Sequence, residues 1–399
     1  MGLIRLYNSA DMARILIVKL SAIGDVIHCL PLASRLKESI PELVIDWLVE
    51  APGAPLLQNN PVIDQVYVLP KKDWLKNARS GKPSVVQEVL QFMGRLRANK
   101  YDAAIDAQGL FKSAFLARMS GAPKVFGFKG TREMAPMLAT HTLDVGDYFA
   151  PDKHVVDLNL RLADYVASTM PGASPEQKHH THVCFSLPEP TQEALTKIDN
   201  LIGSMLKVGD TIASADLNKS PVVAVIPGTT WDTKIWQDTY WGRLIERLCG
   251  ELSARVIILG GPGDREKNQH IYRMAKSGAN ISQENLRDIT GETNLIELVA
   301  LYKSCDLVIG ADTGPLHLAC ATGQPAVLAV HGASPWGRNG PKGPTGREPY
   351  LAAAHLNLSC QPCFSKSCRL GTIECLKDLP VEEVFQKAKG LLELSLNRL

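Results

Sequence analysis

Short, almost unbroken apolar segments alternate with helical segments in both halves of this 399-residue chain, and no other feature constrains its fold as strongly. They cover residues 14–20, 43–49, 64–70 and 101–107 in the first half, and residues 221–227, 254–261, 306–311 and 325–332 in the second. Strands that are apolar along their whole length are typical of parallel sheets with helices on both faces. The sequence therefore predicts an α/β protein with doubly wound parallel sheets.

The alternation weakens between residues 172 and 220, where turn-forming and polar residues surround one amphipathic piece at 191–206. A chain of 399 residues also exceeds what one hydrophobic core usually fills. We therefore expect two domains, at residues 1–205 and 206–399. In such a protein, ligands usually bind in the cleft at the carboxyl ends of the strands.

Composition excludes several classes of protein. Hydrophobic residues make up 45% and charged residues 21% of the chain, as in ordinary globular proteins. The net charge of +2 provides no field that would favour nucleic acid. The chain has no apolar run of about 18 residues that could span a membrane. Residues 1–13 lack the features of a signal peptide. We expect a cytoplasmic protein that binds no nucleic acid.

A junction in the second half suits the oxygens of a phosphate or diphosphate. After the apolar segment 221–227, Thr229 and Thr230 offer hydroxyl and backbone N–H groups, and Lys234 follows one short loop later. The alternative is an ordinary helix entry with capping threonines and a solvated lysine.

The stretch "DTGPLHLACATGQP" follows the apolar segment 306–311 and forms a second such junction. Asp312 or Thr313 can cap a helix there, Gly314 lets the backbone approach a ligand, and His317 lies in the first turn, where it could donate to an anion. Capping chemistry alone explains these residues equally well.

A third junction, "KLSAIGDVIHCLP", carries Asp25 at a strand-to-helix turn in the first half. An aspartate at this place is either an N-cap or a general base that polarises a hydroxyl group. No GxGxxG pattern is present, so nothing indicates a dinucleotide-dependent dehydrogenase.

Two further segments stand out. Residues 70–82 form a predicted basic loop around Trp74, which is either a solvated surface or a patch for an acidic or phosphorylated partner, at a membrane surface for example. Four of the nine cysteines follow the pattern C-x2-C-x4-C-x6-C: Cys360, Cys363, Cys368 and Cys375. Structural zinc is one interpretation of this cluster, and reduced thiols or a redox-dependent disulfide are the others.

Four motifs together resemble glycosyltransferase family 9, the lipopolysaccharide heptosyltransferases. They are "RILIVKLSAIGDVIHCLP" (14–31), "YDAAIDAQGLFKSA" (101–114), "TTWDTKIW" (229–236) and "LVIGADTGPLHLACATGQPAV" (307–327). The sequences "DVIH", "DAQG" and "TREMAP" (131–136) lean toward the heptosyltransferase I branch, which adds the first heptose.

The resemblance implies a GT-B fold: two Rossmann-like domains facing a cleft, the first binding the acceptor and the second the nucleotide sugar. The last helix is then expected to pack back on the first domain. The implied reaction moves L-glycero-D-manno-heptose from ADP-heptose to a Kdo residue of Kdo-lipid A, with inversion and without a catalytic metal. Its implied place is the cytoplasmic face of the inner membrane.

Roles for individual residues follow from the same resemblance. Asp25 falls on the family's catalytic base, and Lys234 on a catalytic phosphate contact. The implied donor-binding residues are Thr229, Thr230, Lys234, Glu266 (at the ribose), Asp312, Thr313, Gly314 and His317. The implied acceptor-binding residues are Lys72, Lys76 and Arg132.

The chemistry fits these roles independently, because displacement at an anomeric carbon needs a base on one face and a stabilised leaving diphosphate on the other. Two alternatives stay open: a transferase that uses another nucleotide sugar and acceptor in cell-surface glycan synthesis, and a non-catalytic nucleotide-sugar binder.

Overall fold

The computed structural model describes residues 12–80, 84–172, 182–203, 220–278, 281 and 284–396. The chain divides into two compact units, Met1–Pro188 and Glu189–Leu399. The boundary expected between residues 205 and 206 lies outside the described residues. The units divide earlier because α6 (Gln192–Ile202) packs its apolar side against α9 (Leu295–Tyr302), so α6 belongs to the second unit.

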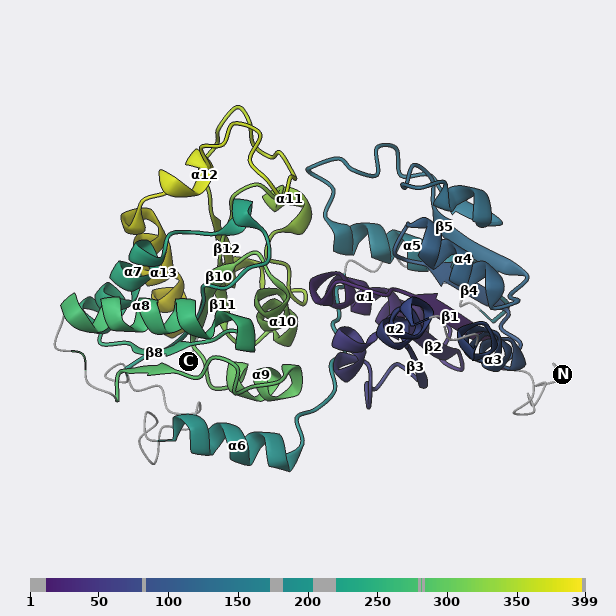
Figure 1. The fold of residues 1–399 in the computed structure, drawn as a ribbon, viewed down its shortest axis with the longest axis horizontal. Coiled ribbons are helices and arrows are strands. Elements are labelled where there is room, and N and C mark those ends of the chain that lie inside the picture. The colour runs from purple at the N-terminus through teal and green to yellow at the C-terminus, as the bar shows by residue number, and fades with distance from the viewer. Residues whose placement is uncertain are drawn as a thin grey trace, which may run out of the picture. The chain divides into compact units, whose positions relative to one another are not determined.

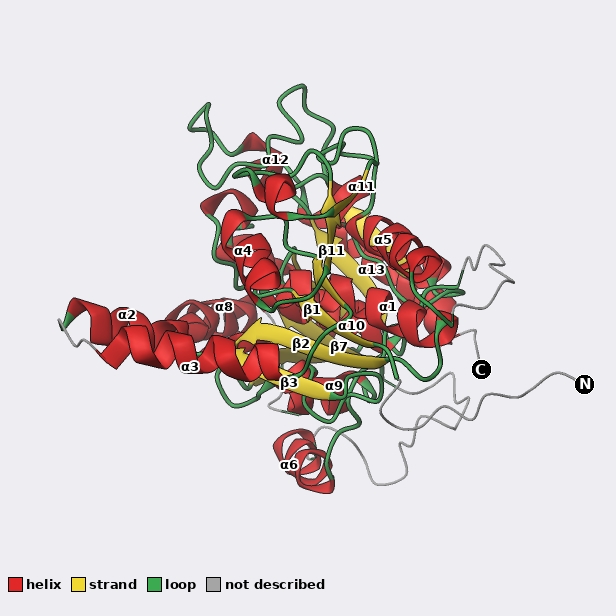
Figure 2. Cartoon of the chain, turned by 90° about the vertical axis from the view of Figure 1, so that its right-hand side faces the viewer, coloured by secondary structure: helices red, strands yellow, loops and turns green. Residues whose placement is uncertain are grey.

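A six-stranded parallel sheet forms the centre of the first unit, in the order β3-β2-β1-β4-β5-β6 (Figure 1). Its strands are β1 (Arg14–Val18), β2 (Val44–Glu50), β3 (Gln65–Leu69), β4 (Ala103–Asp106), β5 (Lys124–Phe128) and β6 (His141–Leu143). Its helices are α1 (Ile23–Ser39), α2 (Lys71–Arg79), α3 (Ser84–Ala98), α4 (Phe111–Met119) and α5 (Val155–Thr169), with short 3-10 turns η1 (Ala51–Leu56) and η2 (Ala135–Leu138). Helices α3 and α4 cover one face, and α1 packs with α5 (Figure 2).

The second unit repeats this plan, with a parallel sheet in the order β12-β11-β10-β7-β8-β9. Its strands are β7 (Val222–Ile226), β8 (Arg255–Ile258), β9 (Leu286–Asp288), β10 (Leu307–Ala311), β11 (Ala326–Val330) and β12 (Leu351–Ala354). Its remaining helices are α7 (Asp238–Glu251), α8 (Arg265–Gly278), α10 (Gly314–Thr322), α11 (Trp336–Asn339), α12 (Glu374–Lys377) and α13 (Val381–Leu396), with 3-10 turns η3 (Asp232–Lys234), η4 (Pro262–Asp264) and η5 (Glu348–Tyr350).

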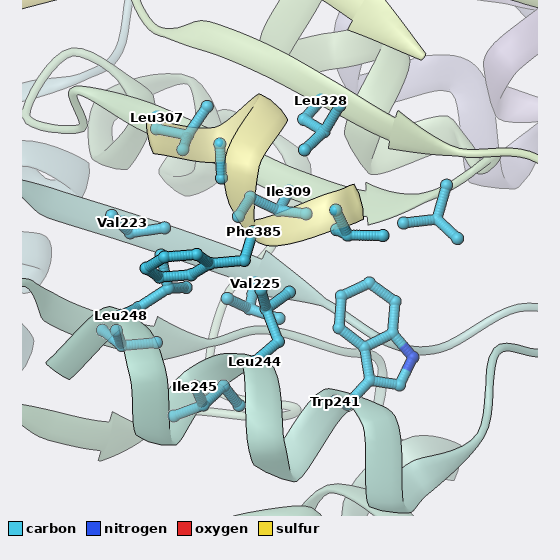
Figure 3. Packing of buried hydrophobic residues seen from close by; sticks show 14 of the residues in the cluster. Val223, Val225, Trp241, Leu244, Ile245, Leu248, Leu307, Ile309, Leu328 and Phe385 are labelled. Atoms are coloured by element: carbon cyan, nitrogen blue, oxygen red, sulfur yellow. The ribbon is translucent and has the colours of Figure 1, made fainter. Parts of the chain in front are cut away.

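Strands β7, β10 and β11 are buried along their whole length, which is the physical reason for their unbroken apolar sequences. On one face of this sheet, Val223, Val225, Leu307 and Ile309 pack against α7 and α13, with Phe385 among them (Figure 3). The predicted α/β fold with two doubly wound parallel sheets is thus confirmed. Strands β5, β6, β9 and β12 were not predicted, and two of them have only three residues.

The last helix, α13, packs against α7 and β10–β12 of the second unit, where its apolar side completes the core. Its expected packing on the first domain stays a prediction. One local expectation differs from the structure. The predicted basic loop at 70–82 is largely the helix α2, because Trp74 packs edge-on against Phe92 of α3 at 5.5 Å between ring centres. Lys82 lies outside the described residues.

Within the described ranges, the structure has no helix that is both long and apolar enough to cross a membrane.

Candidate functional site

Both sheets have a switch point, the place where successive connections leave in opposite directions along the sheet. Ligands of doubly wound proteins bind at the carboxyl ends of the strands there. The switch point lies between β1 and β4 in the first unit and between β7 and β10 in the second. Asp25 follows β1, Lys234 follows β7, and Asp312 follows β10 directly. The predicted site residues therefore occupy equivalent places in the two units.

In the first unit, the loop that leads to Asp25 is held by residues that follow β4. The Nζ atom of buried Lys19 donates to the carbonyl oxygen of Ala107 at 3.0 Å. The backbone N–H groups of Leu20 and Ser21 both donate to Oε1 of Gln108, at 3.1 and 3.3 Å. The two first-half motifs, at 14–31 and 101–114, thus meet at one switch point.

Asp25 lies half-buried in the first turn of α1. It does not occupy the N-cap position, which belongs to Ala22, and its Oδ2 accepts the N–H of Ala22 at 3.1 Å. Burial lowers the pKa of Lys19, but the negative charges of Asp25 and Asp106 help to outweigh burial, so this pKa is raised above its ordinary value. Lys19 therefore stays protonated and supplies a fixed positive charge close to the Asp25 carboxylate.

The predicted acceptor-binding cations lie on two separate segments of the first unit. Lys72 and Lys76 are exposed on α2, one helical turn apart. Arg132 is exposed in the segment after β5, and its guanidinium carbon lies 4.5 Å from the centre of the Phe149 ring. Such a cation–π contact orients the guanidinium while leaving its N–H groups available to anions.

In the second unit, Lys234 and Asp312 form an ion pair at the switch point. The Nζ atom of Lys234 lies 2.7 Å from Oδ2 of Asp312, and it also donates to the carbonyl oxygen of Asp312 at 3.3 Å. The same Nζ atom lies 4.6 Å from the centre of the Trp231 ring. These contacts hold the lysine ammonium group in one place at the carboxyl ends of β7 and β10.

The Asp312 carboxylate also accepts hydrogen bonds from His317 and Ser334. His317 Nε2 lies 2.9 Å from Oδ1, and the Ser334 hydroxyl donates to Oδ2. Burial raises the pKa of Asp312, but the His317 bond and the positive charge of Lys234 help to outweigh burial and bring the pKa well below its ordinary value. His317 Nε2 is therefore directed to Asp312. The contact of His317 with a bound anion, which the sequence suggested, stays a prediction.

Helix α10 begins at Gly314 without a side-chain cap. Thr313 occupies the N-cap position, but its hydroxyl donates to the carbonyl oxygen of Ala311 at 3.2 Å. The first-turn N–H groups of a helix carry partial positive charge and bind anions. Thr313 and Gly314 thus lie where the sequence placed a diphosphate contact.

The loop after β7 carries Thr229, which is half-buried, and Thr230, which is exposed. A Cβ atom at the preceding Gly228 would lie 2.6 Å from the carboxyl carbon of Asp264, so the glycine allows this carboxylate to approach the loop. Glu266 is exposed in the first turn of α8. Asp264, an acid that the sequence motifs did not single out, therefore lies against this loop.

His331 is another residue that the sequence analysis did not select. It follows β11 directly, is fully buried, and neither of its ring nitrogens has a hydrogen-bond partner among the described residues. Burial is the main cause that lowers the pKa of His331 to about 4, although the Asp312 carboxylate opposes this shift. The charged groups that act on it, such as Asp312 and Lys234, follow other strands, so no local sequence pattern marks His331.

The cysteine-bearing segment packs against the loop that carries Lys234. The Thr233 hydroxyl donates to the carbonyl oxygen of Ser365 at 2.6 Å, and the Phe364 N–H donates to the carbonyl oxygen of Ala333 at 2.9 Å. No group of three or more histidine, cysteine or acidic side chains in the described part of the chain is arranged to hold a metal ion. Cys360 is exposed, Cys363 and Cys368 are half-buried, and Cys375 is buried.

Comparison with known proteins agrees with this geometry. Residues 89–374 match the family described as glycosyltransferase family 9 (heptosyltransferase). Lipopolysaccharide heptosyltransferase 1 of Pseudomonas aeruginosa is 28% identical over 361 residues, covering 89% of this chain and 87% of that protein. The protein of the same name from Campylobacter coli is 28% identical over 329 residues, covering 82% and 86%.

Solved structures show the same fold. The E. coli heptosyltransferase WaaC with ADP has a TM-score of 0.67 and 23% identity, covering 95% of this chain and 99% of that chain. A glycosyl transferase family 9 protein from Veillonella parvula has a TM-score of 0.72 and 20% identity, covering 96% and 98%. These likenesses confirm the predicted GT-B class of fold.

Proposed function

This chain belongs to glycosyltransferase family 9, and on that premise we propose that it transfers L-glycero-D-manno-heptose from ADP-heptose to a Kdo residue of Kdo-lipid A in lipopolysaccharide inner-core synthesis. The observation that carries the proposal is which charged groups lie at the two switch points. One unit holds a carboxylate, Asp25, and the other holds a fixed cation, Lys234, beside an uncapped helix N-terminus. Inverting sugar transfer needs these two groups.

We assign acceptor activation to Asp25. Its carboxylate accepts the proton of the Kdo hydroxyl while that oxygen forms a bond to the anomeric carbon of heptose. The bond from this carbon to the ADP oxygen breaks in the same step, which inverts the anomeric centre. The hydrogen bond from the Ala22 N–H orients the carboxylate for this role.

We assign stabilisation of the leaving ADP to the second unit. Lys234 and the first-turn N–H groups of α10 supply positive charge where negative charge develops on the diphosphate, so the step needs no catalytic metal. Thr229, Thr230, Thr313 and Gly314 complete the proposed diphosphate contacts. Asp312 and His317 position Lys234 and the start of α10, and Glu266 is the proposed ribose contact.

The acceptor side of the proposal rests on charge. Kdo-lipid A carries carboxylates and phosphates, and Lys72, Lys76 and Arg132 are exposed cations of the unit that holds Asp25. An acceptor of this kind is anchored in lipid, so the protein would act as a peripheral protein at the cytoplasmic face of the inner membrane.

We also propose that the four clustered cysteines bind one structural zinc ion, and that the ion brings their thiols together. These residues are Cys360, Cys363, Cys368 and Cys375. The close first pair is a usual zinc half-site. The pKa of Cys375 is raised to about 11 by burial and by the three other thiols, so the four groups influence one another. Metal analysis should find one zinc per chain, lost from a Cys363→Ser variant. A metal-free protein with four titratable thiols in this segment would contradict the proposal.

The direct test is a transfer assay with purified protein, ADP-heptose and Kdo-lipid A, read by mass spectrometry. We expect one heptose to be added, and ADP-heptose to raise the Tm, because ligand binding stabilises the folded state. A rise in Tm only with a UDP- or GDP-sugar would make the donor assignment wrong. Binding of ADP-heptose without transfer or hydrolysis would make the chain a non-catalytic binder.

A further inference from the structure

Four large apolar side chains are exposed on α4 and on the segment that follows β5. Phe111 and Phe115 expose 45% and 46% of their surface, and Met134 and Met137 expose 66% and 79%. We call these four residues the α4 apolar surface. Single exposed apolar residues are ordinary, whereas a group of them on one surface is typical of an interaction site.

The four residues belong to neighbouring elements. Phe111 and Phe115 are one helical turn apart on α4, with their rings stacked at 6.2 Å between centres. The η2 turn packs directly on α4, and the N–H of Phe111 donates to the carboxylate of Glu133 at 3.3 Å. This segment contains the "TREMAP" motif, which includes Met134 and is followed directly by Met137. Neither methionine has a role assigned above.

The first unit also has a cationic helix face, on α2. The outer side of α2 carries Lys72, Leu75, Lys76 and Arg79, all exposed and at helical spacing, while Trp74 packs inward. We call these four residues the α2 cationic face.

Helices α2 and α4 begin at the same carboxylate at the end of β2. Lys71, the first residue of α2, lies 3.1 Å from Oε1 of Glu50, and Lys112 of α4 lies 3.2 Å from the same atom. Burial raises the pKa of Glu50, but the bonds from Lys71 and Lys112 outweigh burial and lower the pKa overall. The negative charge of Glu50 is thus neutralised. Cationic and apolar groups predominate among the exposed side chains of these elements, which also include the acids Asp73 and Glu133.

The start of α4 adjoins the loop that leads to Asp25. Gln108, which binds the Leu20 and Ser21 N–H groups, lies three positions before Phe111. An acceptor whose sugar reaches Asp25 would therefore have its lipid portion within reach of α4.

We propose that the α4 apolar surface and the α2 cationic face together dock this protein on an anionic lipid bilayer. The phenylalanine and methionine side chains enter the interfacial layer, and the lysines and the arginine bind headgroup phosphates. This inference rests on the proposed function in one respect only, namely that the acceptor is anchored in lipid.

The test is sedimentation of the full chain with sucrose-loaded vesicles, without donor or acceptor. Vesicles of phosphatidylethanolamine with phosphatidylglycerol are compared with vesicles in which phosphatidylcholine replaces the phosphatidylglycerol. We expect binding only to the anionic vesicles, weakened by salt because surface charges are screened. A Phe115→Ser/Met137→Ser variant should lower the bound fraction about fivefold or more, whereas Leu394→Ser, a matched exposed site on α13, should not.

Activity distinguishes docking from folding and from the reaction itself. The Phe115→Ser/Met137→Ser variant should keep its Tm and its rate with a deacylated, water-soluble Kdo acceptor, and lose rate only with acceptor in vesicles. Equal vesicle binding by the variant and the wild type would overturn the proposal, as would a concentration-dependent dimer that the double substitution abolishes. If the wild type binds vesicles but transfers no heptose, the proposed function fails and the docking surface stands.

Discussion

The Nζ atom of Lys234 lies 2.7 Å from Oδ2 of Asp312, across the switch point between β7 and β10. His317 and Ser334 bind the same carboxylate, so Asp312 is satisfied from three directions. This network holds the ammonium group in place before any ligand binds. Groups that are fixed in advance stabilise developing charge more effectively than groups that must first reorganise.

The first prediction concerns Lys234 itself. Lys234→Met should lower kcat roughly 10²- to 10³-fold, the usual cost of removing one fixed charge-stabilising group, and should weaken ADP binding. Steady-state kinetics and calorimetric titration with ADP measure these two effects. The matched control is Lys303→Met, which removes a lysine paired with Glu189 at 2.8 Å on the surface. Equal losses in the two variants would argue against a specific role.

The second prediction concerns Asp25. Asp25→Asn keeps an oxygen acceptor for the Ala22 N–H but removes the base. Transfer should fall roughly 10²- to 10⁴-fold, the range that general bases contribute, while the Kd for ADP stays nearly unchanged. Asp73→Asn, in the first turn of α2, serves as the control. Near-normal turnover of Asp25→Asn would show that another group takes the proton.

The third prediction concerns Gln108, a positioning residue. Gln108→Ala removes the acceptor shared by the Leu20 and Ser21 N–H groups, which should loosen the loop before Asp25. We expect a lower kcat with an unchanged KM for ADP-heptose, because the donor side is untouched. Gln65→Ala, whose amide donates to the neighbouring carbonyl of Val66, is the control. A rise in donor KM without a change in kcat would contradict this assignment.

The fourth prediction concerns the pH dependence of stability. The pKa of His331 is about 4 in the folded protein and about 6.5 when unfolded, so the unfolded chain binds the proton first as the pH falls. The contribution of His331 to stability is therefore present above pH 6.5 and is lost as the pH falls toward 4.

The difference between the folded and unfolded pKa of His331 corresponds to about 3 kcal/mol in the free energy of unfolding. Compared with His331→Phe, which cannot titrate, the wild type should lose that much additional free energy of unfolding between pH 7 and pH 4. Urea unfolding at several pH values measures the difference. Parallel curves for the two proteins would mean that His331 has an ordinary pKa.

Much of the fold was predictable because burial on both faces of a parallel sheet leaves few sequence solutions. Every apolar segment singled out in the sequence contains or overlaps a strand, and β7, β10 and β11 are fully buried. The three-residue strands β6 and β9 are too short to form a pattern of their own. Helix α2 was expected as a loop because its aromatic anchor, Trp74 against Phe92, is a contact between two helices.

The sequence by itself determined which junctions carry chemistry, because the residue that follows a parallel strand always lies at the carboxyl edge of its sheet. Only the tertiary structure decided which of these junctions become neighbours. Strand order brings Lys234 to Asp312 and adds Ser334 from the loop after β11, although these residues are far apart along the chain. Apolar periodicity indicates whether a strand is buried, but it does not indicate which strand lies beside it.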